Sequence, residues 1–166
     1  MKKTIYLGFD HGAFQVRGFV RRYLGEKQVA YKDFSKEKLD PSDDYPDAVV
    51  PAEKAAAKDG SFAIVGCSSG TGSSIAANKV KGIRAAPLHD ETLVYLARLH
   101  NDLNCLALRG MIFSSDIQMQ TAGSYINLLS IKHTSVTEQE VRKLVKVFLE
   151  TEFEGGRHQK RIEKIE

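Results

Sequence analysis

Apolar residues along the chain form short continuous runs separated by longer stretches with a helical period. A short apolar run is expected to be a buried strand, and apolar residues three or four apart are expected to line one face of a helix. The runs predict five strands, at Thr4–Phe9, from Val29–Tyr31, at Ser61–Gly66, at Ile83–Ala86 and at Asn104–Leu108. Because helical stretches separate them, the pattern predicts a three-layer α/β sandwich with a five-stranded parallel sheet and helices on both faces.

The helices between the strands are indicated by apolar stripes and by residues typical of helix ends. One stripe runs from Ala13 to Gly25, and a second helix begins near Pro46, which suits a first helical turn, and continues to Lys58. A third helix is expected directly after the loop that ends at Gly72. In the fourth, over residues 89–100, one face is shared by Leu93, Leu96, Ala97 and His100.

The segment after the fifth strand has a less regular pattern. Ser115 and Gln118 are spaced as a capping box, which predicts a helix to about Leu129. Residues 131–135 are then expected to be a connection. We expect residues 113–136 as a whole to be an extra segment beside the fifth strand.

The end of the chain combines an amphipathic helix with a basic arm. Thr137 and Glu140 form a capping box at the start of this helix, which Gly155 and Gly156 are expected to end. The arm, residues 155–166, carries Arg157, His158, Lys160, Arg161 and Lys164. Such a run is often only a solvated surface, and no aromatic residues alternate with these charges as they do in many nucleic-acid-binding segments. We therefore expect no nucleic-acid partner.

The composition fits a single globular domain over residues 1–166. Hydrophobic residues make up 42% of the chain and charged residues 27%, with a formal net charge of +3. No apolar run approaches the roughly 18 residues of a membrane span, and the first residues lack the features of a secretion signal. Cys67 and Cys105 are therefore expected to be free thiols in a cytoplasmic protein with no membrane partner.

The main candidate for chemistry is the loop of small residues that follows the third strand. Cys67 lies where the strand enters this loop, which continues through Ser68, Ser69, Gly70, Thr71 and Gly72. Glycines let the backbone approach a ligand closely, and the N-terminus of the following helix presents free N–H groups to an anion. A helix N-terminus also favours the thiolate form of a nearby cysteine. A lone cysteine is more often a small buried apolar residue, but this setting indicates a base beside a group of N–H donors.

Other polar side chains are predicted at the same edge of the sheet. Asp10 and His11 follow the first strand, and ligands of such sheets bind beyond the carboxyl ends of the strands, where the strand order switches. Each residue also has a purely structural interpretation. Asp10 can cap the next helix, Tyr45 can pack, and His100 can be a structural histidine on its helix face.

The same loop fits two other templates and gives one alternative function. Residues 66–70 match the Gly-x-Ser-x-Gly elbow of serine hydrolases, with Ser68 as nucleophile, and the remaining triad members could be Asp90 or Asp102 with His133 or His158. The start of a dinucleotide fingerprint at Gly70–Gly72 fails because Ile75 occupies the third glycine position. Cys67 and His133 lack the paired spacing of a zinc site, so no metal is expected.

Short segments spread in order over most of the chain together match one enzyme family. They are Gly8–Gly12, Asp44–Asp47, Cys67 with its loop, Ser74–Lys79, Gly82–Ala86, His89–Asp90, His100–Asp102 and Phe148–His158. Through them the sequence resembles the type B ribose-5-phosphate isomerases and the related galactose-6-phosphate isomerase subunits. The resemblance implies a Rossmann-like fold and an aldose–ketose isomerase of sugar phosphates that works without metal or cofactor.

The resemblance also implies catalytic roles for two residues. Cys67 matches the family's base, which moves a proton between C1 and C2 of the sugar through an enediolate. A second branch of the family uses a glutamate at the position of Ser73, so this sequence resembles the cysteine branch. His100 matches the group that opens the sugar ring.

Binding roles follow from the same matches. The substrate-binding positions are Asp10, His11, Tyr45, Ser68, Ser69, Gly70, Thr71, Gly72 and Asn101. In the family two arginines, matched by Arg157 and Arg161, come from a neighbouring subunit and hold the phosphate together with the histidine matched by His11. The resemblance thus implies a homodimer or homotetramer with shared sites, in which the basic arm reaches a partner.

Departures from the family pattern leave the exact sugar open. Ser68 replaces a usual glycine, and Arg109-Gly110-Met111 stands where the family commonly has Gly-x-Arg, so the phosphate-binding arginine is missing or supplied by Arg109. Ribose 5-phosphate is the expected substrate, and a six-carbon sugar phosphate such as allose or galactose 6-phosphate is the alternative. A serine hydrolase and a sugar-phosphate-binding protein without catalysis remain the alternatives in other functional classes.

Overall fold

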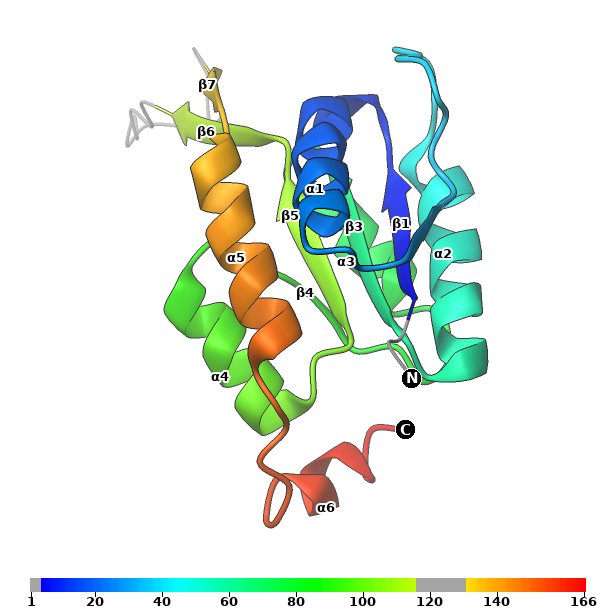
Figure 1. Ribbon diagram of the computed structural model, residues 1–166, viewed down its shortest axis with the longest axis vertical. Helices are drawn as coiled ribbons and strands as arrows, with labels where there is room; N and C mark the ends of the chain where they lie inside the picture. Colours follow the sequence, from blue (N-terminus) through cyan, green and yellow to red (C-terminus); the bar gives the residue numbers. More distant parts are fainter. Residues whose placement is uncertain (1–3, 116–130) are drawn as a thin grey trace, which may run out of the picture.

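A computed structural model describes residues 4–115 and 131–166 of the chain (Figure 1). Five parallel strands form one sheet in the order β2-β1-β3-β5-β4. They are β1 (Ile5–Phe9), β2 (Tyr31–Asp33), β3 (Phe62–Cys67), β4 (Ala85–Pro87) and β5 (Cys105–Arg109). The predicted five-stranded parallel sheet is therefore confirmed, with boundaries shifted by one or two residues at most strands.

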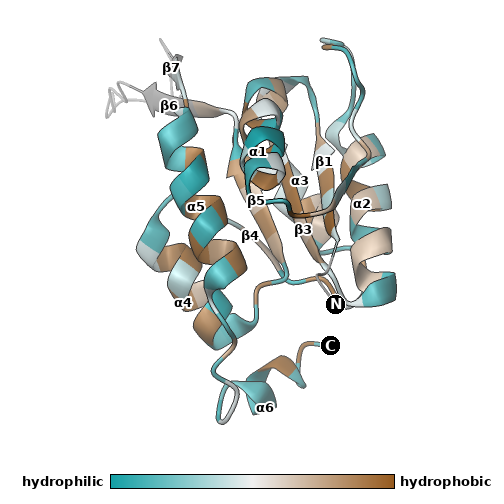
Figure 2. Ribbon diagram, in the orientation of Figure 1, coloured by the Kyte–Doolittle hydropathy of each residue, from teal (hydrophilic) through white to brown (hydrophobic). Residues whose placement is uncertain are grey.

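Helices cover both faces of this sheet, as predicted. One face carries α1 (Phe14–Glu26), α4 (Glu91–Asn101) and α5 (Glu138–Glu150), and the other carries α2 (Tyr45–Asp59) and α3 (Thr71–Ala77) (Figures 1 and 2). Alternate residues of β5 serve the two layers, because successive side chains of a strand point to opposite faces. Leu106 and Leu108 join the core under α1 and α5, whereas Cys105 and Ala107 join the core under α2 and α3.

The amino and carboxyl edges of the sheet carry different parts of the chain. Each strand is followed by a loop at the carboxyl edge, and the next helix returns to the amino edge. Figure 1 shows the C-terminal arm, with α6 (Gln159–Ile162), below the amino edge. The short 3₁₀ turn η1 (His11–Ala13) lies at the carboxyl edge, between β1 and α1.

One sequence-based prediction for the segment after β5 is wrong. Residues 131–135 are not a connection but strand β7 (Ile131–Ser135), which pairs antiparallel with β6 (Met111–Ser115). The β-branched residues Ile131 and Thr134 favour such a strand. The predicted helix to about Leu129 lies outside the described residues. That residues 113–136 are an addition to the family fold stays a prediction.

The last long helix ends earlier than Gly155. Its predicted capping box is present, with the Thr137 hydroxyl accepting from the Glu140 N–H, but the helix stops at Glu150. Thr151 takes an extended backbone conformation, and its N–H and hydroxyl both donate to the Val147 carbonyl, which satisfies the end of the helix. Gly155 and Gly156, with φ of 71° and 58°, instead turn the chain into the arm.

The second cysteine is fully buried and structural. Cys105 donates its S–H to Glu53 of α2 at 2.6 Å, and both side chains are excluded from solvent. Burial raises the pKa of the Cys105 thiol and raises the pKa of Glu53 to about 7. Cys105 therefore remains a protonated donor, and it serves below as a control for Cys67.

None of the helices in the described ranges is both long and apolar enough to cross a membrane.

Candidate active site

The carboxyl ends of β1 and β3 bring two of the predicted site segments together. The strands pair in register at Phe9 and Gly66, and the Asp10 N–H donates to the Gly66 carbonyl at 3.3 Å. The turn after β1 packs directly on the loop after β3, since a methyl group on Gly12 would lie 2.1 Å from Ser68 Oγ. In the sheet, β1 lies between β2 and β3. The chain crosses from one side of β1 to the other between these two strands, and such a switch in strand order is where sheets of this kind bind ligands.

The loop after Cys67 has the backbone geometry of an anion site. Gly70 takes φ of 78°, a conformation that favours glycine, and α3 begins at the next residue. The Thr71 N–H is satisfied by Ser69 Oγ at 3.2 Å. In the part of the chain that the structure describes, the N–H groups of Ser69 and Gly70 have no protein acceptor. These donors lie beside Cys67, which is itself only 6% exposed.

A second glycine, Gly110, packs beneath the Cys67 loop. The Gly110 N–H, just after β5, donates to the carbonyls of Cys67 at 2.9 Å and Ser68 at 3.1 Å. A methyl group on Gly110 would lie only 1.8 Å from the Gly12 carbonyl oxygen. The segments after β1, β3 and β5 therefore meet through main-chain atoms, with no room for a side chain.

Asp10 has the capping role that its sequence position suggested. Its carboxylate accepts from the Gly12 N–H at 2.9 Å, and its side chain is buried. Burial raises the pKa of Asp10, partly opposed by the neighbouring His11. Capping does not exclude substrate binding, because a carboxylate has two oxygens and four acceptor positions.

His11 is held by a residue that the sequence analysis did not single out. Asp43 accepts from the His11 backbone N–H at 2.9 Å and lies 2.8 Å from its Nδ1. The hydrogen bond that Asp43 accepts from His11 raises the pKa of His11 above its usual value. His11 therefore keeps its own positive charge to a higher pH, and a positive charge at the carboxyl edge suits an anionic substrate.

Tyr45 stands across from the glycine loop. It is the first residue of α2, and a methyl group on Gly72 would lie 3.0 Å from its ring. The ring thus closes one side of the Cys67 loop. Together with Asp10, His11 and residues 67–72, it forms what we call the carboxyl-edge group.

His100 and Asn101 do not belong to this group. They end α4, which runs back to the amino edge, and the Asn101 carbonyl accepts from Arg84, the residue before β4. Ala63 to Cys67 span four residue steps from the amino to the carboxyl end of β3, which is about 13 Å along the strand. One copy of the chain therefore does not bring Cys67 and His100 into one site.

The basic arm lies on the same side as His100. Arg161 lines a cavity of about 550 Å³ together with His100 and Asn101, and the arm residues Ile162 and Ile165 form part of its apolar wall. Arg157 precedes His158, which stacks on His100. We call His100, Asn101, Arg157 and Arg161 the amino-edge group.

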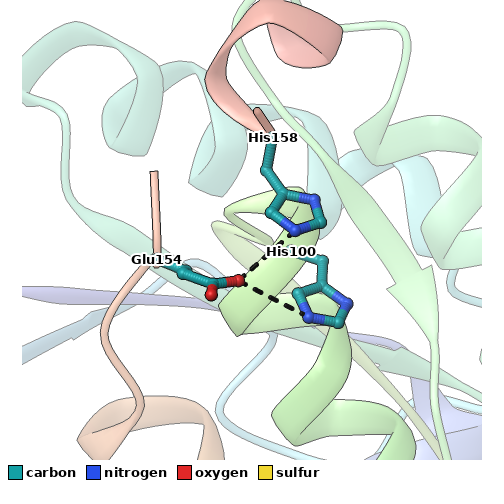
Figure 3. A group of neighbouring side chains, drawn as sticks. All are labelled: His100, Glu154 and His158. Carbon is teal, nitrogen blue, oxygen red and sulfur yellow. Dashed lines mark ion pairs between the residues drawn. The ribbon is translucent and has the colours of Figure 1, made fainter. Parts of the chain in front are cut away.

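Figure 3 shows a carboxylate beside His100 of this group and the neighbouring His158. Glu154 Oε2 lies 3.7 Å from His100 Nε2 and 3.3 Å from His158 Nε2, and the two rings stack with centroids 4.3 Å apart. Burial, followed by the charges of His100 and Arg157, lowers the pKa of His158. The sequence analysis did not predict that Glu154 and His158 contact His100, although it included His158 among the charged residues of the arm.

These three side chains could in principle hold a metal ion, because their donor atoms lie within 4.8 Å of one another. The orientation of the two rings does not favour a metal ion. They are nearly parallel, at 7°, so the in-plane lone pairs of the two histidines do not converge on one point. The expectation of a metal-free site stays a prediction.

The serine hydrolase alternative finds no triad in the described residues. Asp102 and His158 lie at the amino edge, away from Ser68, and Asp90 caps α4 through the Leu93 N–H at 3.0 Å. The side chain of His133 lies outside the described part of the structure. Arg109 ends β5 beside Cys67. Burial, followed by the charge of Arg109, lowers the pKa of His89, and both residues border α5.

Comparison with known proteins identifies the family. The family model described as "Ribose/Galactose Isomerase" matches residues 5–165. A probable ribose-5-phosphate isomerase B of Mycoplasma pneumoniae is 35% identical over 99% of this chain and 94% of its own. A D-erythrulose-4-phosphate isomerase of Pectobacterium atrosepticum is 29% identical over 98% and 92%.

A solved structure gives the same result for the fold. The crystal structure of ribose-5-phosphate isomerase B from Mycoplasma genitalium with bound ribulose 5-phosphate has a TM-score of 0.80 and 32% identity, over 99% of this chain and 95% of that one. These proteins are sugar phosphate isomerases, as the sequence resemblance implied. The chain is therefore an aldose–ketose isomerase of sugar phosphates, and it belongs to the ribose/galactose isomerase family.

Proposed function

We propose that this protein interconverts ribose 5-phosphate and ribulose 5-phosphate in a site that two copies of the chain form together. The observation that carries the proposal is the separation of the two groups. Cys67 and its N–H donors lie at the carboxyl edge, and His100 with the basic arm lies at the amino edge. A second copy that presents its amino-edge group to the first copy's Cys67 supplies everything the reaction needs.

The proton transfer belongs to the carboxyl-edge group. The Cys67 thiolate removes the proton at C2, next to the carbonyl of the open-chain sugar, and returns it to C1, while the hydroxyl proton passes from O2 to O1. The negative charge that develops on the enediolate oxygen is stabilised by the free N–H groups of Ser69 and Gly70 and by the first turn of α3. Each such donor contributes roughly 3–4 kcal/mol to similar reactions.

The amino-edge group prepares and holds the substrate. His100 of the second copy protonates the ring oxygen as the sugar opens, and Asn101 hydrogen-bonds a hydroxyl. Arg157 and Arg161 hold the phosphate, since the planar guanidinium fork matches phosphate oxygens, and His11 approaches it from the carboxyl edge. Asp10 and Tyr45 complete the contacts around the sugar.

The reaction and its substrate are tested by solvent-deuterium exchange. We expect the protein in D₂O to incorporate deuterium at C2 of ribose 5-phosphate and to form ribulose 5-phosphate, because the thiol exchanges its proton with solvent between the two transfers. NMR on a panel of four-, five- and six-carbon aldose phosphates measures both effects. Faster exchange with allose or galactose 6-phosphate would move the assignment to a six-carbon sugar, and binding without exchange on every sugar would contradict the mechanism.

The ion pair at His11 gives a pH-dependent prediction. Asp43 raises the pKa of His11, so the positive charge on His11 persists to higher pH than it would alone. Replacing Asp43 with asparagine should lower that pKa, and KM for ribose 5-phosphate should then begin to rise at a lower pH than in the wild-type protein. Profiles of KM between pH 5.5 and 9 measure the shift. Asp47→Asn, a change in the nearby first turn of α2, is the control, and an identical profile for Asp43→Asn would rule out the role.

A further inference from the structure

Arg84 joins three separate parts of the amino edge. Its Nε donates to the carbonyls of Asn101 at 3.2 Å and Asp102 at 3.0 Å, and its Nη2 lies 2.7 Å from the Asp102 carboxylate. Its Nη1 pairs with the carboxylate of Glu166 in the basic arm. The side chain is only 17% exposed, so these charged contacts are largely shielded from water.

The backbone of Arg84 is fixed as firmly as its side chain. The Arg84 N–H donates to Asn104 Oδ1 at 2.7 Å, and its carbonyl accepts from the N–H groups of Asn104 and Cys105. The Asn104 amide also donates to the Gly82 carbonyl at 2.7 Å. The guanidinium therefore projects from a rigid support at the start of β4, and it can hold other segments in place.

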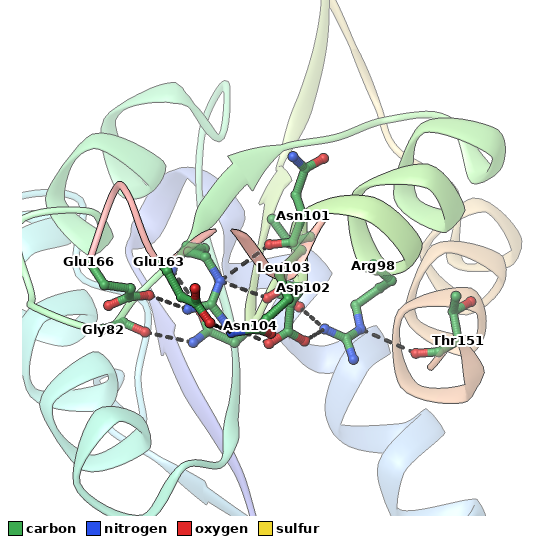
Figure 4. A network of polar contacts seen from close by, with 11 residues as sticks. Gly82, Arg98, Asn101, Asp102, Leu103, Asn104, Thr151, Glu163 and Glu166 are labelled. Carbon is green, nitrogen blue, oxygen red and sulfur yellow. Dashed lines mark hydrogen bonds and ion pairs between the residues drawn. The ribbon is translucent and has the colours of Figure 1, made fainter. Parts of the chain in front are cut away.

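The end of α4 is held from two sides. Asp102 takes a left-handed conformation with φ of 45°, which aspartate adopts more readily than most residues with a side chain because its carboxylate can form local hydrogen bonds. Its carboxylate is held between two arginines, because Arg98 Nη1 lies 2.8 Å from the other carboxylate oxygen. Figure 4 shows Asp102 in the middle of this network, with Arg98 on one side and Glu166 on the other.

The same guanidinium reaches the arm that carries Arg161. Glu166 lies five residues beyond Arg161, and both residues line the cavity beside His100 and Asn101. Local hydrogen bonds of α6 and the turn after it connect them, such as those from the Ile162 N–H to His158 and from the Ile165 N–H to Ile162. Holding Glu166 therefore fixes how far the arm, with Arg161, lies from the end of α4.

We propose that Arg84 is a positioning residue of the isomerase, which holds the end of α4 and the basic arm as one unit. Through Asn101 and Asp102 it orients His100, and through Glu166 it sets the position of Arg161. Neither Arg84 nor Glu166 needs to touch the substrate. The inference rests on the proposed function, because it assigns the ring-opening and phosphate-binding groups of one site to this unit.

The fork of Arg84 is what makes this coupling possible. Three nitrogens in one plane donate to two carbonyls and two carboxylates at the same time. A lysine keeps the charge but has one compact donor group, so it cannot hold α4 and the arm together. The conservative substitution therefore separates positioning from charge.

The test compares Arg84→Lys and Glu166→Ala with a control, Arg142→Lys. Arg142 forms ion pairs with both Glu26 and Glu138. It belongs neither to the carboxyl-edge group nor to the amino-edge group. We expect Glu166→Ala to raise KM for ribose 5-phosphate roughly three- to tenfold with kcat unchanged, since only the arm is released. Arg84→Lys should also lower kcat, roughly tenfold, and the control should change neither parameter more than about twofold.

Amide hydrogen exchange on the protein without substrate gives a readout independent of activity. Exchange at residues 159–165 should accelerate in both variants and stay slow in the control, while α5 is unchanged in Glu166→Ala. Unchanged exchange in the arm together with an unchanged KM in Glu166→Ala would overturn the proposal. If the wild-type protein showed slow amide exchange in the arm but no isomerase activity, the proposed function would be refuted. The contact between Arg84 and the arm would still stand.

Discussion

Replacing Cys67 with alanine is expected to lower kcat for ribose 5-phosphate by about 10²- to 10⁴-fold, the usual contribution of a positioned acid–base group. The loop and its N–H donors remain, so the enediolate is still stabilised but no group transfers the proton. Cys67→Ser should be almost as slow, because a hydroxyl is a much weaker acid than a thiol. Conversion to ribulose 5-phosphate, followed by NMR, measures the loss.

Cys105→Ser is the matched control for this prediction. Cys105 is the other free cysteine and is fully buried against Glu53. A serine hydroxyl at this position can still donate a hydrogen bond to the Glu53 carboxylate. We expect its kcat to stay near the wild-type value. Near-normal turnover of Cys67→Ala, or an equal loss in both cysteine variants, would show that Cys67 is not the base.

Mixing two inactive variants is expected to restore activity. Cys67→Ala and His100→Ala each remove one residue from every site of a homodimer. In a mixed dimer one of the two sites receives intact Cys67 from one chain and intact His100 from the other. Random reassembly of equal amounts makes half of the dimers mixed, which gives about a quarter of the wild-type activity.

This recovery separates shared sites from sites within one chain. If each chain built its own site, every site in the mixture would lack one residue and the mixture would stay inactive. Mixing Cys67→Ala with a Cys67→Ala, His100→Ala double variant is the control, because no site in that mixture holds an intact Cys67. Recovery requires exchange of subunits, which mass spectrometry of differently tagged chains checks.

The carboxyl-edge group was predictable from the sequence because its signals are local. An apolar run followed by small residues marks the end of a strand, and parallel strands place those ends together. Asp10, His11 and the Cys67 loop were assigned to this edge on that basis, and the structure places them there. The capping role of Asp10 follows from the same local pattern.

The position of His100 also follows from the order of strands and helices. A helix that follows a strand of a parallel sheet must return to the amino edge, so a residue at its end cannot lie beside a strand's carboxyl end. His100 is the residue before the last in α4. The separation of the two groups is thus a consequence of connectivity alone.

Contacts between distant residues could not be predicted in this way. Asp43 and His11 are 32 positions apart, and Arg84 and Glu166 are 82 apart, so no local spacing indicates either pair. The β6–β7 pair was missed for a related reason. β6 and β7 pair across a long intervening segment of the chain, and the capping-box spacing at Ser115 favours a helix after that residue.

The contact between Gly12 and Gly110 limits how substrate preference can change during evolution. Because main-chain atoms of three segments touch beneath the Cys67 loop, substitutions there have no free volume to enlarge or shorten the space for a sugar. Adaptation to a longer or shorter carbon chain must therefore come from residues around the Cys67 loop and not from the main-chain contact beneath it.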